Sequence, residues 1–416
     1  MISMDKKRNI NEMSILAFLI VARLACPALT NIPLMNMTFV FIYGVLFCFL
    51  HVVFDNRMTK QDFVLFVSVS LYVTYIITRL LIAGQGIFSK DAFNAYMLFF
   101  LINILLWSKN QTAELRSNLF KLILFTCAFN FLYSIWILIL DPDASRRAAA
   151  TSVLEASPHD VLNAVGSFDA VYGAIFVILL AIYMRKNMQK GRERIIVTLI
   201  MIIMALVFIV MAAYATAILI LLLALIICLN NKKSLIFGIG TVIILVILIF
   251  HEFIGNAIMA LADSVNYSKI LSLRVKEFGY MLKTFEATGT YAGEEGRWQK
   301  LIDSFTTFTM HPIFGGLGIR GSKIGGHSEI FDILGKYGLF GFVLLVIVFV
   351  NLYKSLTDNL TDEKSVKCLK IMFFIYIVLS VLNPSLYALL IMPIVLMFPL
   401  SKDYMEQAKN RDKAKN

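Results

Sequence analysis

Long apolar runs without a charge constrain this chain more than any other feature of its sequence. The run 195–229 holds 35 residues without Asp, Glu, Lys or Arg, more than one helix needs to cross the hydrocarbon of a bilayer. We therefore expect two short helices that turn near Tyr214. No soluble domain buries so much apolar surface, because 59% of the 416 residues are hydrophobic and 16% are charged, against about a quarter in soluble domains.

The same template, an apolar stretch of about 17 to 25 residues, fits further segments. Together they predict an all-α, polytopic membrane protein with about twelve transmembrane helices, forming a single integral membrane domain over 1–416. Besides the pair in 195–229, the expected spans are 13–30, 34–54, 63–83, 92–107, 117–140, 168–184, 234–254, 329–352, 367–383 and 386–400.

Basic residues set the expected orientation. With the amino terminus inside, the cytoplasmic segments carry 24 of the 38 lysines and arginines, as the positive-inside rule requires. Both termini are then cytoplasmic, and the two sizeable loops, 141–167 and 255–328, both face outward. The net charge of +11 reflects this distribution, so it does not indicate nucleic acid.

Two further patterns bear on processing and metal binding. The five cysteines lie in or beside apolar segments and their number is odd, so neither a disulfide framework nor a metal site is indicated. The basic amino-terminal stretch is followed by no small-residue cleavage site, so we expect an uncleaved first span.

The outer loop 255–328 has amphipathic patterning. Apolar residues recur at helical spacing through 263–286 with basic residues on the other face, which predicts a helix on the membrane surface. A second helix is expected from Arg297 to His311. Its apolar stripe comprises Trp298, Leu301, Ile302 and Phe305, and Arg297 and Lys300 lie off that stripe.

A glycine-rich segment follows Pro312. Glycines let backbone amides approach a ligand without obstruction by a Cβ atom. Arg320 and Lys323 lie among them. Six of the 22 glycines fall within twelve positions, namely Gly315, Gly316, Gly318, Gly321, Gly325 and Gly326.

His327 ends this segment at the expected start of a membrane span. The following Ser328 and acidic residues are typical of a helix amino terminus, whose dipole disfavours an imidazolium. His327 is therefore a candidate general base, and Arg297 is a candidate ligand for phosphate oxygens. These residues suggest transfer from a phosphorylated donor. On the residues alone, His327 as a simple cap and Arg297 with Trp298 as a headgroup anchor stay open.

Further arginines are candidates because charges inside spans are functional suspects. Arg23 lies in the first span, and Arg79 lies near the outer end of the third. Arg146 and Arg147 lie in the loop 141–167 and break the positive-inside trend, which fits an anionic ligand as well as solvated loop charge.

The order of these motifs resembles the signature of the O-antigen ligase and polymerase superfamily, bacterial membrane enzymes that build surface polysaccharides. The matching stretch covers about 45 residues, and Val165–Asp169 looks like the family's Gly-x-Phe motif. The matching residues are Gly296, Arg297, Trp298, Phe305, His311, Pro312, Gly315, Gly318, His327, Gly338 and Gly341.

Two departures from the family pattern stand out. Ser328 replaces the usual Asn after the histidine, and Tyr214–Ala217 replaces a Ser-Arg pair, so one expected phosphate-binding arginine is missing. Arg79, Arg146 or Arg147 is the expected substitute. Arg320 and Lys323 complete the candidate diphosphate-binding set.

The resemblance implies a Wzy-type polymerase of O-antigen or capsular polysaccharide in the bacterial plasma membrane. Its substrates would be oligosaccharides on undecaprenyl diphosphate, with His327 as base and Arg297 stabilising the departing diphosphate. Trp298, Pro312, Gly315, Gly316 and Gly318 would shape the catalytic loop. The resemblance requires no metal, cofactor or nucleic acid, and it admits membrane lipid and a chain-length regulator protein as partners.

Three alternatives stay open at this point. A ligase of the same superfamily would move a finished glycan onto lipid A core. A lipid-linked oligosaccharide flippase has a similar number of spans, but the discontinuous paired half-helices that mark many transporters are not evident in the sequence. A lipid-dependent glycosyltransferase of the multispan type normally carries acidic residues in its first outer loop for metal or base work, and here that loop is the uncharged 31–33.

Overall fold

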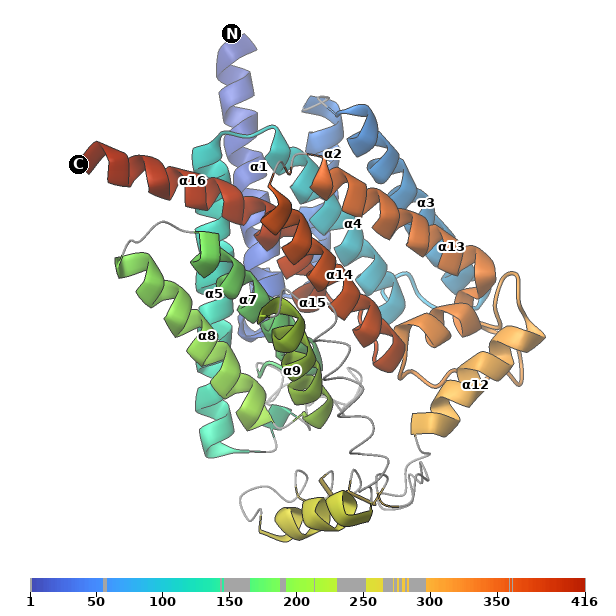
Figure 1. Cartoon of the computed structure of the whole chain (residues 1–416). Coiled ribbons are helices and arrows are strands. Elements are labelled where there is room, and N and C mark those ends of the chain that lie inside the picture. Colours follow the sequence, from blue (N-terminus) through green and yellow to red (C-terminus); the bar gives the residue numbers. More distant parts are fainter. Residues whose placement is uncertain are drawn as a thin grey trace.

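The computed structural model describes most of the chain as a bundle of helices (Figure 1). It describes residues 2–54, 58–142, 144–145, 165–187, 192–212, 214–229, 252–264, 272, 275–276, 279–280, 283, 297–358, 360 and 362–415. Within these ranges all regular secondary structure is helical, and eight helices are long and apolar enough to cross a membrane. The expected all-α, polytopic membrane fold is confirmed at that level, and the count of about twelve spans stays a prediction.

The first half forms five long helices. The helices overlap the expected spans, and those at Lys60–Ile82, Lys90–Lys109 and Ala113–Leu140 are among the eight candidate membrane spans. The first helix begins at Ile2 and ends at Ala25, because Pro27 and Pro33 open two short 3-10 turns, at Pro27–Asn31 and Pro33–Met35. The hydroxyls of Thr59, Ser89 and Thr112 cap the starts of three helices. The helices are α1 (Ile2–Ala25), α2 (Met37–Phe54), α3 (Lys60–Ile82), α4 (Lys90–Lys109) and α5 (Ala113–Leu140).

The second half confirms the expected division of the longest apolar run. α8 (Arg192–Ala212) and α9 (Ala215–Leu229) are separate helices with Tyr214 between them. A π-helical turn, Pro393–Met397, joins α15 (Ala388–Met392) to α16 (Phe398–Lys415), where Pro393 cannot donate a helical hydrogen bond. The others are α7 (Phe168–Asn187), α12 (Arg297–Met310), α13 (Glu329–Thr357) and α14 (Glu363–Leu382).

Parts of three sequence predictions lie outside the described residues. These are the expected span 234–254 up to residue 251, most of the loop 141–167, and much of the surface helix 263–286. Residues 252–263 form a helix, drawn in yellow in Figure 1. The described residues of 272–283 are helical and pack on it, since a Cβ on Gly255 would lie 2.5 Å from the Gly279 carbonyl oxygen.

Helices α3 and α13 run side by side (Figure 1). At one end the Lys109 ammonium of α4 binds Asp62 at 2.6 Å and the Ser355 hydroxyl at 2.6 Å. At the other end Tyr75 donates a hydrogen bond to the Tyr337 carbonyl oxygen at 2.7 Å. Polar contacts at both ends therefore fix the register of this pair.

The described edges of both long loops lie at one end of the bundle, and both termini lie toward the other (Figure 1). Gly166 donates to the Ser134 hydroxyl at 2.8 Å, so the earlier loop rejoins the bundle at the carboxyl-terminal part of α5. Phe168 contacts Tyr387, beside the segment that receives the start of α13. The two expected outer loops thus approach a common region.

We predict that this common end faces outward in the cell. In spheroplasts, a membrane-impermeant maleimide should label Arg320→Cys, because that position is exposed at the loop end. The matched variant Asp358→Cys, exposed at the opposite end, should be labelled only after permeabilisation. The wild-type protein gives the background from its own cysteines, and the reverse labelling pattern would refute the orientation.

Candidate functional site

One polar face of α12 binds the segment that leads to His327. The Thr307 hydroxyl donates to the Lys323 carbonyl oxygen at 2.6 Å and accepts from the Lys323 amide at 3.0 Å. One turn earlier, the Ser304 hydroxyl accepts from the Gly325 amide at 2.9 Å. Both hydroxyls belong to buried residues. Side chains at helical spacing therefore satisfy the backbone of an extended segment that has no strand partner.

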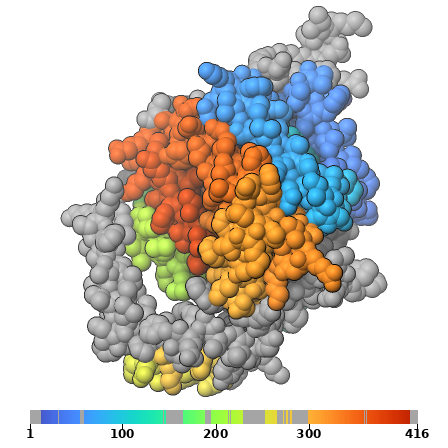
Figure 2. Space-filling view, turned by 90° about the vertical axis from the view of Figure 1, so that its right-hand side faces the viewer, coloured from blue at the N-terminus to red at the C-terminus, as the bar shows by residue number. Residues whose placement is uncertain are grey.

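The apolar stripe expected on α12 lies on the other side of the helix. Ile302 and Phe305 are 39% and 49% exposed, whereas Ser304 and Thr307 are 0% and 3% exposed. The sequence predicted the helix correctly, but not that its polar residues would form the buried contact. Figure 2 shows α12, in orange, on the surface beside the blue helices of the first half.

His327 meets α12 through Lys300. The Lys300 ammonium nitrogen lies 2.9 Å from the Nε2 atom of His327, and Lys300 is one turn before Ser304 on the same face. An ammonium group has only donors, so Nε2 accepts. An imidazole that accepts at Nε2 has a lone pair there, which is the form that a general base requires.

Asp332 holds the backbone on both sides of His327. Its carboxylate accepts from the Gly326 amide at 3.1 Å, the Ser328 amide at 3.2 Å and the Ser304 hydroxyl at 2.6 Å. The carboxylate thereby joins α12, the glycine-rich segment and the first turn of α13. The sequence showed Asp332 only as a helix-start acid, and its position four residues after Ser328 was the available signal.

The start of α13 is fixed to α14 and α15. The Ser328 hydroxyl caps α13 by accepting from the Phe331 amide at 3.4 Å, as expected, and it donates to the Ser380 carbonyl oxygen at 3.2 Å. The Glu329 carboxylate accepts from the amides of Ser385 and Leu386 at 2.7 and 2.9 Å. Sequence reasoning missed this role of Glu329, because its partners lie more than fifty residues away.

Helix α13 is broken at Gly338, which has φ 68° and ψ −171°. The segment after Pro312 fills the break. The Gly316 amide donates to the Gly335 carbonyl oxygen at 2.8 Å, and the Leu339 amide donates to the Pro312 carbonyl oxygen at 2.8 Å. The loop thus satisfies the groups that the break removes from helical hydrogen bonding. This break in α13 was not evident in the sequence.

Close packing accounts for the first glycines of the segment. A Cβ atom on Gly315 would lie 2.3 Å from the Lys336 carbonyl, and one on Gly318 would lie 2.6 Å from the Ala83 Cβ atom. The Gly315 amide donates to the His311 carbonyl oxygen at 2.9 Å. These glycines therefore admit neighbouring protein atoms, and the expectation that their bare amides approach a ligand is not met at Gly315 and Gly316.

Arg79 reaches this segment from α3. Its Nη2 atom donates to the Gly315 carbonyl oxygen at 3.1 Å, and its buried Nε atom has no partner within the described residues. Arg79 therefore holds the glycine-rich segment, some distance along it from His327. Arg23, the deeper arginine, donates to the Met35 carbonyl oxygen at 2.9 Å and so fixes the turns after α1.

The other candidate cations divide into two groups. Arg320 and Lys323 are exposed on the glycine-rich segment, and Pro312 is exposed where that segment begins. Arg297 and Trp298 begin α12, but their side chains lie outside the described part of the structure, as do Arg146 and Arg147 as a whole. The structure thus joins Lys300, which the sequence left without a role, to His327.

A second polar cluster missed in the sequence lies beside the break. The Asp91 carboxylate at the start of α4 binds the Lys336 ammonium at 2.7 Å and accepts from the Tyr337 hydroxyl at 3.0 Å. This cluster ties the first half of α13 to α4. Among the described residues, no group of His, Cys, Asp and Glu side chains is placed to hold a metal.

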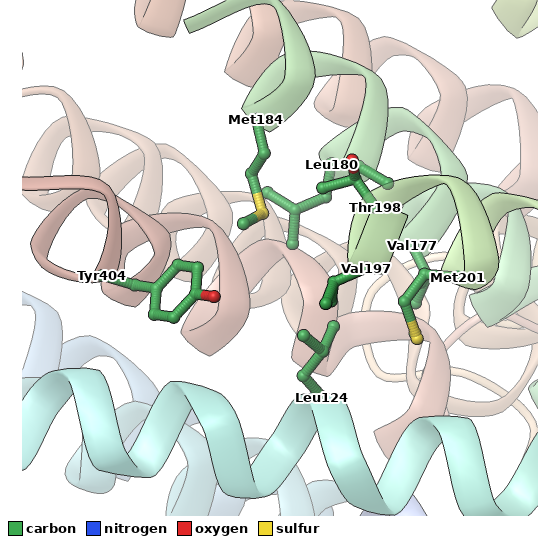
Figure 3. A pocket seen from close by; sticks show the side chains of 9 residues that line it. Leu124, Val177, Leu180, Met184, Val197, Thr198, Met201 and Tyr404 are labelled. Atoms are coloured by element: carbon green, nitrogen blue, oxygen red, sulfur yellow. The ribbon is translucent and has the colours of Figure 1, made fainter. Parts of the chain in front are cut away.

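A small apolar cavity lies away from this site (Figure 3). It measures about 10 Å³ and lies among α5, α7, α8 and α16, toward the end that carries the termini. Its lining includes Leu124, Met184, Met201 and Tyr404. Nothing in it offers a charge, so it takes no part in the chemistry considered for His327.

Comparison with known proteins adds no family. No family model matches the chain, and no curated protein matches it. The likeness to the ligase and polymerase superfamily therefore rests on the motif residues themselves.

Gly338→Ala should destabilise the protein by about 1 to 3 kcal/mol through backbone strain, because only glycine adopts this backbone conformation at low cost. The new Cβ would also lie 2.3 Å from the Ile313 carbonyl oxygen. Thermal unfolding in detergent measures the change. The control Gly86→Ala has open space around it and should shift the free energy of unfolding by less than about 0.5 kcal/mol. Equal unfolding midpoints for the two variants would contradict this account of the break.

Proposed function

We propose that this protein is a membrane polysaccharide polymerase of the bacterial plasma membrane. It would transfer a glycan from undecaprenyl diphosphate to a hydroxyl of another lipid-linked repeat unit at the outer face. The observation that carries the proposal is His327, bound through Nε2 to a lysine ammonium and fixed through both flanking amides by the backbone contacts of Asp332. An immobile neutral imidazole beside positive charge suits a base acting next to an anionic leaving group.

The proposed reaction balances without an added reagent. The acceptor hydroxyl loses its proton to His327 as its oxygen forms a bond to the anomeric carbon of the donor. The bond from that carbon to the diphosphate oxygen breaks, and the electron pair leaves with the diphosphate. Arg297 and the neighbouring cations stabilise the charge that develops on the leaving group. The imidazolium then releases its proton to water.

The polymerase is preferred over the ligase because polymerases of this superfamily diverge widely, which fits Ser328 and the missing Ser-Arg pair. A ligase requires lipid A core as acceptor, whereas a polymerase requires only lipid-linked repeats. The choice of acceptor therefore separates the two activities.

The broken helix α13 gives the flippase alternative its one supporting observation, since discontinuous helices often hold substrates in transporters. In this chain the carbonyl oxygens of Gly335 and Lys336 and the amides of Leu339 and Phe340 are hydrogen-bonded to the loop that fills the break. These four backbone groups are therefore already paired with protein partners and do not face an ion or a substrate. This argues for a structural role of the break and favours the enzyme.

Purified protein in nanodiscs should make a ladder of longer glycans when lipid-linked repeat units are the only substrate and a chelator removes metal ions. His327→Ala should reduce the rate at least about 100-fold, the usual contribution of a general base. Arg297→Ala should also stop elongation. Lys354→Ala, which removes an exposed side chain at the opposite end of α13, serves as the control and should retain activity. A full ladder from His327→Ala would exclude His327 as the base.

The cellular phenotype separates the polymerase from the flippase. Cells that lack the protein should accumulate single repeats on lipid at the outer leaflet, because export continues without elongation. Trapping of the repeats at the inner leaflet would instead support transport.

A further inference from the structure

Lys300 has an unusual partner for a lysine at the edge of a membrane protein. Among the described residues, the only hydrogen-bond partner of its ammonium group is Nε2 of His327, at 2.9 Å. No carboxylate pairs with it in the described ranges, although Lys336, Lys109 and Arg116 each have one. A half-buried ammonium with three donors therefore faces one basic nitrogen and retains unused positive charge.

The carboxylate of Asp332, which contacts the backbone on both sides of His327, already has its own hydrogen-bond donors. Asp332 accepts three hydrogen bonds, from Ser304 and from the amides of Gly326 and Ser328. It fixes the backbone around His327 and does not bind Lys300. The charge of Lys300 is thus neutralised by no described side chain, and an oxyanion entering between α12 and the start of α13 would supply what is missing.

We propose that Lys300 binds a phosphate oxyanion by exchanging His327 for it. In the structure the ammonium occupies the Nε2 lone pair. When a diphosphate enters, the ammonium turns to its oxygens, and Nε2 becomes available to take a proton. The identity of the donor, a lipid-linked diphosphate, rests on the proposed function. Binding of its diphosphate to Lys300 would release Nε2 of His327, which could then act as the base.

Exchange predicts a thermodynamic signature that a purely structural lysine would not give. If Lys300 must break its hydrogen bond to His327 to bind an oxyanion, the energy of that bond opposes binding. A variant without the imidazole has no such bond to break, so it should bind the oxyanion more tightly. His327→Ala should then tighten binding of inorganic pyrophosphate, by about threefold, whereas Lys300→Met should weaken it by about tenfold. In the double variant the tightening should vanish, because the two side chains act through one contact.

The test is calorimetric titration of inorganic pyrophosphate into the full-length protein in phosphatidylcholine nanodiscs. Lys300→Arg keeps the charge and should bind nearly as the wild type does. Lys354→Met, an exposed lysine at the opposite end of α13, is the matched control and should leave the affinity unchanged. Phosphatidylglycerol nanodiscs form a second arm. Weaker pyrophosphate binding there, in the wild type but not in Lys300→Met, would identify a lipid headgroup as a source of the same oxyanion.

The proposed exchange would be refuted if Lys300→Met bound pyrophosphate as tightly as the wild type, or if His327→Ala bound it more weakly. If Lys300→Met does not fold, Lys300→Arg and His327→Ala still decide the question. No glycan is present in this titration, so its failure is distinct from failure of the transfer assay. A protein that elongates glycans without the predicted affinity changes would retain the proposed function and lose this assignment.

Discussion

The structure depends on a rule of the bilayer: backbone amides and carbonyls that leave a helix find no water in the hydrocarbon and must be satisfied by protein. Gly338 breaks α13, and the segment after Pro312 supplies the missing partners through its own backbone. That exchange requires close approach, so Gly315 and Gly338 have no room for a Cβ atom. The glycine-rich segment and the first half of α13 therefore behave as one packed unit.

This packed unit determines where His327 lies. The segment is fixed to α13 at the break, to α3 through Arg79, and to α12 through Ser304 and Thr307. His327 directly precedes Ser328, the cap of α13, so the contacts with all three helices fix its position. The interactions are hydrogen bonds between short side chains and backbone groups, which leave few torsions free. A fixed position of this kind suits an imidazole that must hold one ring nitrogen next to a substrate.

The charge at the site is unevenly distributed. Asp332 and Glu329 both accept hydrogen bonds from backbone amides, so their charges serve to join elements. Lys336 is paired with Asp91. Lys300 alone among these groups has no carboxylate partner within the described residues, and its ammonium lies beside His327. A negatively charged reactant is the natural complement of this arrangement.

The sequence by itself determined the helical class, most helix bounds, the division near Tyr214 and the cap at Ser328. Bilayer thickness sets the length of an apolar span, and caps are local hydrogen bonds, so both can be read from neighbouring residues. Only the tertiary structure decided which face of α12 is buried, that α13 breaks at Gly338, and that Lys300 meets His327. These outcomes depend on contacts between segments distant in the sequence, and no local pattern specifies which partner each polar group finds.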